Sequence, residues 1–413
     1  MKKRLIYTLF ALTTATIQAK INEVKVRQVT IPVMNHREFN PVMGLNLKLD
    51  KEDKLTLIGV DIKGTNLSDI KEISIHSAGL DKNGKVHGDA TSSKKLGSVD
   101  KFTPKQSRYV IQCDGSALKK GDNHLWVSVK TTDNASIKRC IEIAVHGVKT
   151  KSSLEKIADA SCKQRIGVAI TYPNFTAEVR AAESGKLLEK RVSKYSRIPG
   201  LVVTKKGTVI ATFDNRYHHN GDLPADIDVA VRRSTDGGQS WSPIYTCINA
   251  RDIAGIGQGV GDPAILLDES NNRIWIAGLA APKTGHPIWK SELGSASPAK
   301  CGQLILAYSD DEGKTWSKPI NITESIKRVG DKDTNDWGCI FQGPGNGICM
   351  RNGTLVFPAQ VWGVKAEGKK MGDKRVGCLV YSKDNGKTWT SSKSMDFGGS
   401  ESTVAELSDG SLM

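Results

Sequence analysis

Long apolar runs are scarce in this sequence: after the first nineteen residues, no uninterrupted apolar stretch is as long as a membrane span. We therefore expect the mature protein to have no integral membrane segment. The first nineteen residues combine a basic start, Met1 to Arg4, with an apolar stretch, Leu5 to Ile17, and a small residue, Ala19. This is the layout of a secretory signal peptide. Residues 1–19 are therefore predicted to be a signal, and the protein to be exported to the periplasm, the cell surface or the medium.

Metal-binding cysteine patterns are absent as well. None of the eight cysteines forms a C-x-x-C pair, which argues against a structural zinc site. The adjacent His218 and His219 also lack the spacing of zinc ligands, and we expect neither a metal nor a cofactor. Disulfides and buried free thiols both stay open, because an exported protein can oxidise its cysteines but a chain of this length does not need disulfides to fold.

Acidic residues are fewer than basic ones, 44 against 59, which gives a formal net charge of +15. A basic surface favours acidic ligands, although lysines spread over a solvated surface would give the same surplus. Helix-turn-helix, zinc-finger and single-strand-binding patterns are missing, so nucleic acid is not expected as a partner. The sequence leaves the oligomeric state unknown.

Long stretches of helical periodicity are almost absent, and short alternating runs such as Leu125 to Val129 and Ile227 to Val231 dominate instead. Gly, Asn, Asp and Lys clusters separate these runs, so we predict an all-β chain. A polar segment, in which Ser152 and Glu155 could cap one short helix, predicts the domain boundary. The expected domains are a β-sandwich at residues 20–150, a linker at 151–162 and a second all-β domain at 163–413.

The second domain contains a repeated phrase, S-x-D-x-G-x-[ST]-W, at Ser234–Trp241, Ser309–Trp316 and Ser382–Trp389. In a tight hairpin the aspartate can bond amides of its own turn, glycine takes a conformation that a Cβ disfavours, and tryptophan packs beneath. The copies lie too far apart for one propeller blade each, but suit a propeller in which only some blades keep the phrase. We expect a structural role for the three aspartates.

A second turn signal occurs at Lys206-Gly207, Asn352-Gly353 and Asp409-Gly410, each of which predicts a two-residue turn between two apolar strands. After the third turn, the return strand has barely begun at Met413. An unpaired strand edge is unfavourable, so we expect the natural chain to continue.

Upstream of the first repeat, Tyr195 to Gly200 reads Tyr-Ser-Arg-Ile-Pro-Gly. This segment resembles the arginine-isoleucine-proline motif that opens the catalytic propeller of bacterial exo-sialidases, or neuraminidases, a family with Asp-box repeats of the kind described above. The resemblance covers residues from about 160 to the end. It implies that residues 163–413 form a six-bladed β-propeller, incomplete because its C-terminal blades are lacking. The preceding sandwich is similar to the carbohydrate-binding-like accessory domain of some bacterial sialidases.

The resemblance implies that Arg197 is the first of three arginines that bind the substrate carboxylate. Sialic acid carries a carboxylate on the carbon of its glycosidic bond, so a permanent anion lies beside the developing oxocarbenium charge. The planar guanidinium fork matches two carboxylate oxygens, which lysine cannot reproduce. The alternative for Arg197 is an exposed salt bridge.

By the same resemblance, Arg216 lines the sugar pocket and Asp222, on the next loop, is the general acid/base. Such an acid is partly shielded from water, so that its pKa rises enough for it to donate a proton near neutrality. Asp226 and Asp228 are competitors, but Asp228 belongs to an alternating strand and Asp226 directly precedes it. We therefore prefer Asp222.

The remaining site residues also follow from the resemblance. Asp262, in Gly-Asp-Pro-Ala, matches a segment that contacts polar groups of the sugar, although a strand-entry turn explains it as well. Gln360 is a weaker pocket candidate. Glu401 matches the glutamate that polarises the nucleophile, whereas Glu406 is expected to be structural. The family's nucleophile is a tyrosine, expected beyond Met413 together with the other two carboxylate-binding arginines.

The implied activity is that of a retaining exo-α-sialidase, which acts on sialylated glycoproteins, glycolipids or oligosaccharides. Because the tyrosine is lacking, we expect the 413-residue chain to be inactive by itself. The alternative is a non-catalytic, lectin-like propeller that binds sialic acid. A structural adhesin that displays the sandwich domain is a third possibility.

Overall fold

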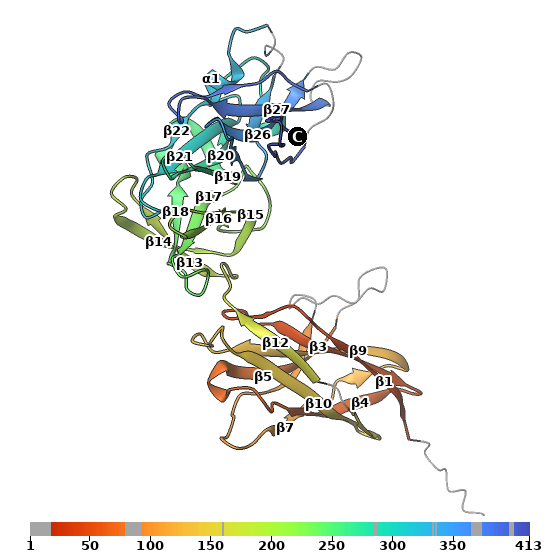
Figure 1. The fold of residues 1–413 in the computed structure, drawn as a ribbon. Coiled ribbons are helices and arrows are strands. Elements are labelled where there is room, and N and C mark those ends of the chain that lie inside the picture. The colour runs from red at the N-terminus through yellow and green to blue at the C-terminus, as the bar shows by residue number, and fades with distance from the viewer. Residues whose placement is uncertain are drawn as a thin grey trace, which may run out of the picture. The chain divides into compact units, whose positions relative to one another are not determined.

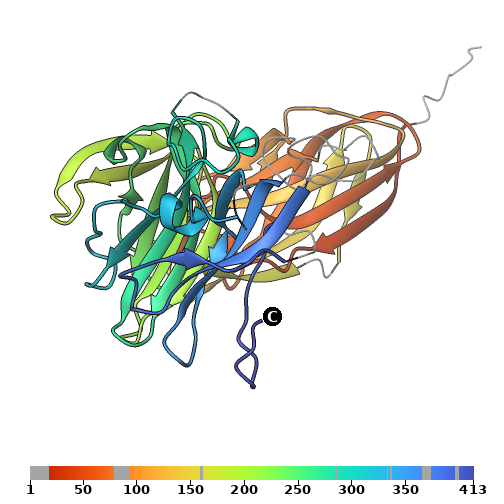
Figure 2. The same ribbon diagram turned by 90° about the horizontal axis from the view of Figure 1, so that it is seen from above.

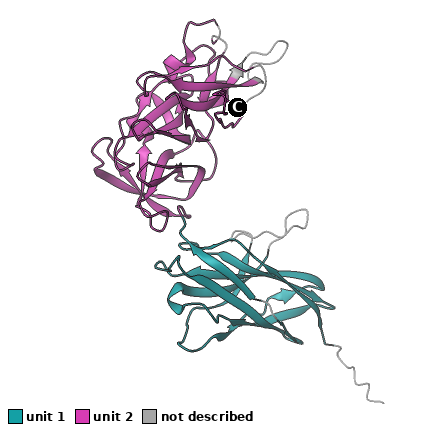
Figure 3. Cartoon of the chain, viewed as in Figure 1, with its two compact units in different colours: residues 1–169 teal, residues 170–413 magenta. Residues whose placement is uncertain are grey.

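The computed structural model describes residues 18–78, 93–158, 161–283, 287–332, 334, 337–364, 374–395 and 400–413. The chain divides into two compact units, residues 1–169 and 170–413 (Figure 3). In the described ranges, helical structure is limited to α1 (Thr323–Lys327) and the short 3-10 turns η1 (Leu67–Asp69), η3 (Ala250–Asp252) and η4 (Ile288–Lys290). No helix among these residues has the length and apolar character needed to cross a membrane. Nearly all of the expected signal peptide lies outside the described residues.

The first unit consists of two antiparallel sheets, with strand orders β1-β3-β9-β5-β6 and β2-β12-β10-β4-β7. In the second sheet, β11 pairs with β10, β8 pairs with β4, and only the β2–β12 contact is parallel. The strands are β1 (Ile21–Gln28), β2 (Val33–Met34), β3 (Asn40–Leu49), β4 (Asp53–Asp61), β5 (Ile70–Ser77), β6 (Lys94–Val99), β7 (Arg108–Gln112), β8 (Ala117–Leu118), β9 (Gly121–Thr131), β10 (Cys140–Thr150), β11 (Leu154–Lys156) and β12 (Ser161–Gly167).

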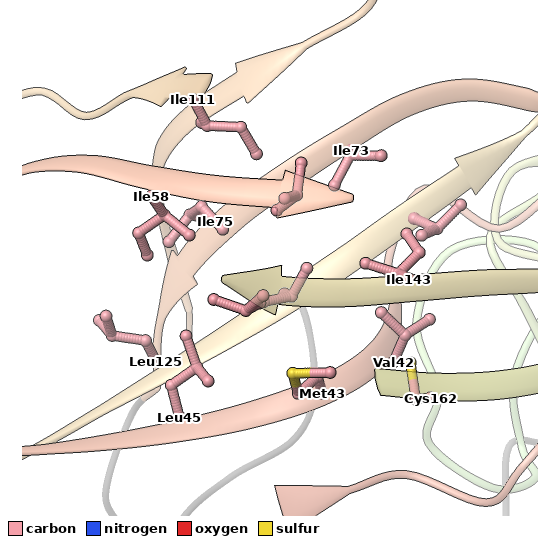
Figure 4. Close-up of a cluster of buried hydrophobic side chains, with 14 of the residues drawn as sticks. Val42, Met43, Leu45, Ile58, Ile73, Ile75, Ile111, Leu125, Ile143 and Cys162 are labelled. Atoms are coloured by element: carbon pink, nitrogen blue, oxygen red, sulfur yellow. The ribbon is translucent and has the colours of Figure 1, made fainter. Parts of the chain in front are cut away.

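The core of this unit lies between its two sheets. Alternate residues of the strands point inward, as Leu45, Ile73 and Ile75 do from one sheet and Ile58 and Ile143 from the other (Figure 4). Because side chains alternate between the faces of a strand, the intervening polar residues face outward. The period-two pattern therefore predicted this β unit correctly.

The structure differs from the expected linker at residues 151–162. Instead of a helix near Ser152, the chain forms β11 and β12, and both strands pair with β10. Cys162 and Ile166 alternate with polar residues along β12 and are buried in the core of the first unit. Cys162 and Ile166 lie with the buried Gln164 on the inward face of β12, and the other face is polar. The division between the units therefore falls after Ala169.

The second unit contains three consecutive antiparallel meanders, β15-β16-β17-β18, β19-β20-β21-β22 and β23-β26-β27-β28. They follow one another from green to blue in Figures 1 and 2. The hairpin β13–β14 extends the first meander, β24 pairs with β19, and β25 with β26. The strands are β13 (Phe175–Arg180), β14 (Leu187–Ser193), β15 (Tyr195–Val203), β16 (Val209–Arg216), β17 (Ile227–Ser234), β18 (Ile244–Ile248), β19 (Ile256–Asp268), β20 (Arg273–Pro282), β21 (Gln303–Ser309), β22 (Ile320–Asn321), β23 (Cys339–Gln342), β24 (Gly345–Asn346), β25 (Ile348–Cys349), β26 (Leu355–Val364), β27 (Lys374–Ser382) and β28 (Thr390–Ser391).

Each meander has the form of a propeller blade, which confirms the all-β prediction for this part of the chain. A total of six blades stays a prediction. All eight cysteines belong to the described residues and are free thiols, so the alternative of buried or half-buried thiols is the one found.

Each Asp-box repeat joins the third and fourth strands of a blade. In the second copy, the carboxylate of Asp311 accepts hydrogen bonds from the Thr315 amide at 2.9 Å and from the Thr315 hydroxyl at 2.7 Å. The hydroxyl of Ser309 donates to Asp311 at 2.8 Å and accepts the amide of Gly313 at 2.9 Å. The other two copies repeat this network. The aspartates therefore close the hairpins, as the sequence predicted.

Replacing Asp311 with alanine is expected to destabilise the second unit by about 1–3 kcal/mol, because amide and hydroxyl donors lose their acceptor. Urea denaturation followed by tryptophan fluorescence measures this, since seven of the eight tryptophans lie in this unit. Asp310→Ala is the matched control. Among the described residues, the carboxylate of Asp310 is exposed and forms an ion pair with Arg273 alone, and an exposed pair contributes about 1 kcal/mol or less. Equal losses for the two variants would contradict the structural role of the box.

The glycine turns are longer than expected. The amide of Thr204 donates to the carbonyl of Thr208 at 2.9 Å, and the amide of Gly207 donates to the carbonyl of Thr204 at 2.9 Å. This closes a three-residue loop with Gly207 at a φ of +82°. A two-residue type I′ turn needs positive φ at two positions, but only the glycine has it. The turns at Gly353 and Gly410 follow the same pattern.

Candidate active site

One pocket of the second unit gathers most of the residues singled out in the sequence. Its lining includes Arg197, Asp222, Asp262, Gln360 and Glu401. They come from β15, the loop after β16, β19, β26 and the segment near the end of the chain. The blades therefore bring together residues that lie up to about two hundred positions apart.

Two of these residues belong to similar bulges on the first strands of consecutive blades. The ladder between β15 and β16 shifts register between Arg197 and Gly200, and Ile198 has a φ of +56°. The ladder between β19 and β20 shifts between Gly261 and Ala264, and Asp262 has a φ of +53°. A bulge redirects side chains locally, and positive φ is rare for a β-branched residue such as isoleucine. Both Ile198 and Asp262 line the pocket.

Asp222 lies between two arginines. Its Oδ1 accepts hydrogen bonds from Nη1 of Arg197 and from Nη1 of Arg216, both at 2.8 Å. Arg216 also donates through Nε and Nη2 to Oδ2 of Asp214, at 3.0 and 2.7 Å. The side chains of Arg216 and Asp214 are each 1% exposed, whereas that of Asp222 is 69% exposed. Arg216 therefore links the buried carboxylate of Asp214 to the exposed carboxylate of Asp222. Arg216 was expected to line the sugar pocket, but it is buried beside the pocket and is absent from its lining.

This arrangement corrects one expectation about Asp222. The hydrogen bond from Arg216, together with the charges of Arg216 and Arg197, holds the pKa of Asp222 below its ordinary value. The raised pKa that a proton donor requires, expected from the sequence, is therefore not found. The exposed salt bridge named as the alternative for Arg197 is present, with Asp222 as its partner, and the binding of a substrate carboxylate by Arg197 stays a prediction. Asp222 accepts a hydrogen bond from the Arg197 guanidinium and is ionised near neutrality.

Asp262 has the opposite electrostatic environment. Burial, with a smaller contribution from the charges of Asp222 and Glu401, raises the pKa of Asp262 to about 6. Its amide donates to Oδ1 of Asp214 at 2.8 Å. Within the described residues, its carboxylate has no hydrogen-bond partner. Near neutrality this side chain is therefore mainly ionised, and its protonated fraction grows as the pH falls toward 6.

The two competing aspartates lie outside the pocket lining. Asp226 accepts hydrogen bonds from Arg191 at 2.6 Å and pairs with the ring of His218 at 2.9 Å. Asp228 is buried and accepts the hydroxyl of Tyr217 at 2.7 Å. Both hold the ends of the loop that carries Asp222. Their absence from the lining favours Asp222 as the acid, although that role stays a prediction.

Gln360 and the glutamates near the end of the chain also have distinct environments. Gln360 is 1% exposed, and its Oε1 accepts the indole N–H of Trp362 at 2.7 Å. Glu401 lines the pocket, whereas Glu406 pairs with Arg351 at 3.2 Å and accepts its amide at 2.9 Å. The geometry therefore separates a pocket glutamate from a structural one. Among the described residues, no tyrosine belongs to the lining.

Two sequence families match the chain. The N-terminal domain of BNR-repeat neuraminidase matches residues 21–153, and the BNR repeat-like domain matches residues 198–413. A sialidase of Bacteroides fragilis is 32% identical over 445 residues, which cover 100% of this chain and 76% of the relative. The chain belongs to the BNR-repeat sialidase family. The resemblance seen in the sequence is thereby confirmed.

Further relatives agree with this membership. A Clostridium perfringens sialidase is 35% identical over 222 residues, 54% of this chain and 55% of the relative. The solved structure of the Hadza microbial sialidase Hz136 is 29% identical with a TM-score of 0.66, over 92% of this chain and 73% of that chain. Sialidase relatives are propellers, which agrees with the blades described here. The chain spans about half the length of the clostridial relative.

Sequence reasoning missed several residues of this sialidase-family pocket. Trp289, Trp362 and Arg375 line it together with further apolar side chains. They carry no local motif, because they meet only when η4, β26 and β27 pack together. Asp214 was missed too, but Asp214 and Arg216 alternate on one strand and so share a face. That spacing was a signal for the buried pair.

Proposed function

We propose that the protein is a retaining exo-α-sialidase that releases terminal sialic acid from glycoproteins, glycolipids or oligosaccharides. The observation that carries this proposal is the pocket in which Arg197, Asp222 and Glu401 come together. Membership of the sialidase family and the names of its relatives support it. We also propose that the protein is exported, on the basis of the basic, apolar and small-residue layout of residues 1–19.

In this mechanism the substrate carboxylate competes with Asp222 for the Arg197 guanidinium. A planar fork binds a carboxylate through two parallel hydrogen bonds, which is stronger than the single bond that Asp222 makes. When Asp222 leaves Arg197, it loses one of the two cations that stabilise its charge. Its pKa then rises, because the bound substrate also excludes water. Binding thus converts Asp222 into a proton donor for the leaving oxygen.

The other residues complete the proposed reaction. Asp262 accepts hydrogen bonds from polar groups of the sugar, and Gln360 lies in the buried part of the pocket lining. Glu401 acts as the base that polarises a tyrosine nucleophile; that tyrosine is not among the described pocket residues. A neutral phenol avoids the repulsion that a carboxylate nucleophile would feel from the anionic substrate. Water then releases the sugar with retention of configuration.

The test is release of free sialic acid from sialyllactose by the protein expressed from its complete reading frame. Arg197→Lys is expected to lower kcat/KM by about 30-fold or more, because lysine cannot make the paired hydrogen bonds. Arg351→Lys, outside the pocket, is the matched control and is expected to retain activity. If the unsubstituted protein releases no sialic acid, the proposal fails.

The second candidate is a propeller that binds sialic acid without turnover. The described pocket lining without a tyrosine favours it. Calorimetry with sialyllactose separates the two functions. Saturable binding with the substrate recovered intact indicates the binding protein. Free sialic acid in the sample after the titration indicates the enzyme.

A further inference from the structure

We propose that Arg375, stacked on Trp362, binds an acidic group on the sugar next to the one that is released. The acidic group is a carboxylate or a sulfate. This inference rests on the proposed function and deepens it, because it assigns a class of leaving group to the mouth of the same pocket.

The first observation is the geometry of the pair. Trp362 on β26 and Arg375 on β27 are directly opposite in the antiparallel ladder. The central carbon of the Arg375 guanidinium lies 3.9 Å from the centre of the Trp362 ring. The indole is itself fixed by its hydrogen bond to Gln360. Stacking uses the flat face of the guanidinium, so its in-plane N–H groups stay available to a ligand.

The second observation concerns the ion pairs of the two other arginines, Arg197 in the pocket lining and Arg216 buried beside it. Arg197 forms an ion pair with Asp222, and Arg216 pairs with both Asp222 and Asp214. In the described part of the chain, no carboxylate forms an ion pair with Arg375. The lining also contains Asp222, Asp262 and Glu401. Arg375 is therefore a cation of this pocket whose guanidinium forms no ion pair with a protein carboxylate among these residues.

The third observation is depth. Gln360 is 1% exposed and belongs to the buried part of the pocket lining. Arg375 is exposed, as are Trp289, at 48%, and the side chain of Asp222, at 69%. An exo-acting enzyme holds the terminal sugar at the bottom, and the proton donor marks where the leaving group begins. Arg375 therefore lies in the exposed layer that the leaving group passes.

The chemistry of the fork selects the ligand class. Guanidinium binds planar carboxylates and sulfate-like anions through paired, charge-assisted hydrogen bonds. A neutral sugar offers only single hydroxyl contacts. Arg375 therefore favours substrates in which the neighbouring sugar is acidic, such as a second sialic acid or a sulfated sugar. Substrates whose leaving group is neutral lactose are disfavoured in comparison.

The test compares three substrates with the protein expressed from its complete reading frame: α2,3-sialyllactose, α2,8-disialyllactose and a sialyllactosamine with sulfate on the adjacent sugar. Arg375→Ala is expected to lower kcat/KM about 10-fold or more on an acidic leaving group, the size of a lost charged hydrogen bond. The loss on sialyllactose is expected to be several-fold smaller, because lactose offers Arg375 no acidic group. Lys383→Ala is the matched control, because Lys383 lies over the Tyr381 ring outside the pocket.

The outcomes are distinct. A loss on disialyllactose alone identifies a carboxylate subsite, a loss on the sulfated substrate alone identifies a sulfate subsite, and a loss on both identifies a shared one. An equal change on all three substrates overturns the inference. If the unsubstituted protein cleaves none of them, the proposed function fails. Binding of disialyllactose and sialyllactose to the unsubstituted and Arg375→Ala proteins, measured by calorimetry, then decides the inference by the same comparison.

Discussion

Asp222→Ala is expected to reduce cleavage of natural sialosides by about 100-fold or more, the usual contribution of a general acid. A substrate with a phenolic leaving group of low pKa needs little protonation, so its cleavage is expected to fall far less. The measurement is kcat/KM for sialyllactose and for an aryl sialoside with the protein expressed from its complete reading frame. The difference between the two losses isolates proton donation from binding.

The control for this result is Asp310→Asn, which removes an exposed carboxylate outside the pocket. It is expected to leave both substrates unaffected. Equal losses on the two substrates in Asp222→Ala would remove Asp222 from the acid role. Because Asp222 forms hydrogen bonds with Arg197 and Arg216 in the free protein, such a result would leave it as a residue that positions the arginines.

Arg216→Met is expected to destabilise the second unit by about 3–5 kcal/mol, because it leaves the carboxyl group of Asp214, whose pKa burial raises to about 7, without its partner. The side chain of Asp214 is 1% exposed and makes two of its hydrogen bonds with Arg216. Urea denaturation followed by tryptophan fluorescence measures the change.

The double variant Asp214→Asn with Arg216→Met provides the comparison. It removes both charges, so a large part of the lost stability is expected to return. If Arg216→Met has the same free energy of unfolding as the unsubstituted protein, the buried pair does not stabilise the second unit. If the double variant is as unstable as the sum of the single variants, Asp214 and Arg216 are not coupled.

The sequence predicted the features that depend on local chemistry. The Asp-box needs serine, aspartate, glycine and tryptophan within eight residues, so all three copies could be recognised in the sequence. All three form the expected hairpin. The strands followed from alternation, and the family followed from one hexapeptide, Tyr195 to Gly200, together with the boxes. The pocket positions of Arg197, Asp222, Asp262, Gln360 and Glu401 followed from that resemblance.

The rest depends on contacts over long range. Residues 151–162 look polar in the sequence, but β11 and β12 form because they can pair with β10. The bulges at Ile198 and Asp262 exist only through registers set by neighbouring strands. The pairing of Asp222 with Arg197 could not be foreseen, because it depends on where an entire loop folds back. Trp362 and Arg375 meet only because β26 and β27 pair.

The central claim is that the Arg197 fork exchanges Asp222 for the carboxylate of sialic acid. A crystal structure of the protein with a non-hydrolysable sialic acid analogue tests it most directly. The account predicts two hydrogen bonds of about 2.8 Å between the Arg197 guanidinium and the ligand carboxylate, with Asp222 moved toward the glycosidic oxygen. An analogue bound elsewhere, with Arg197 still paired to Asp222, would contradict it.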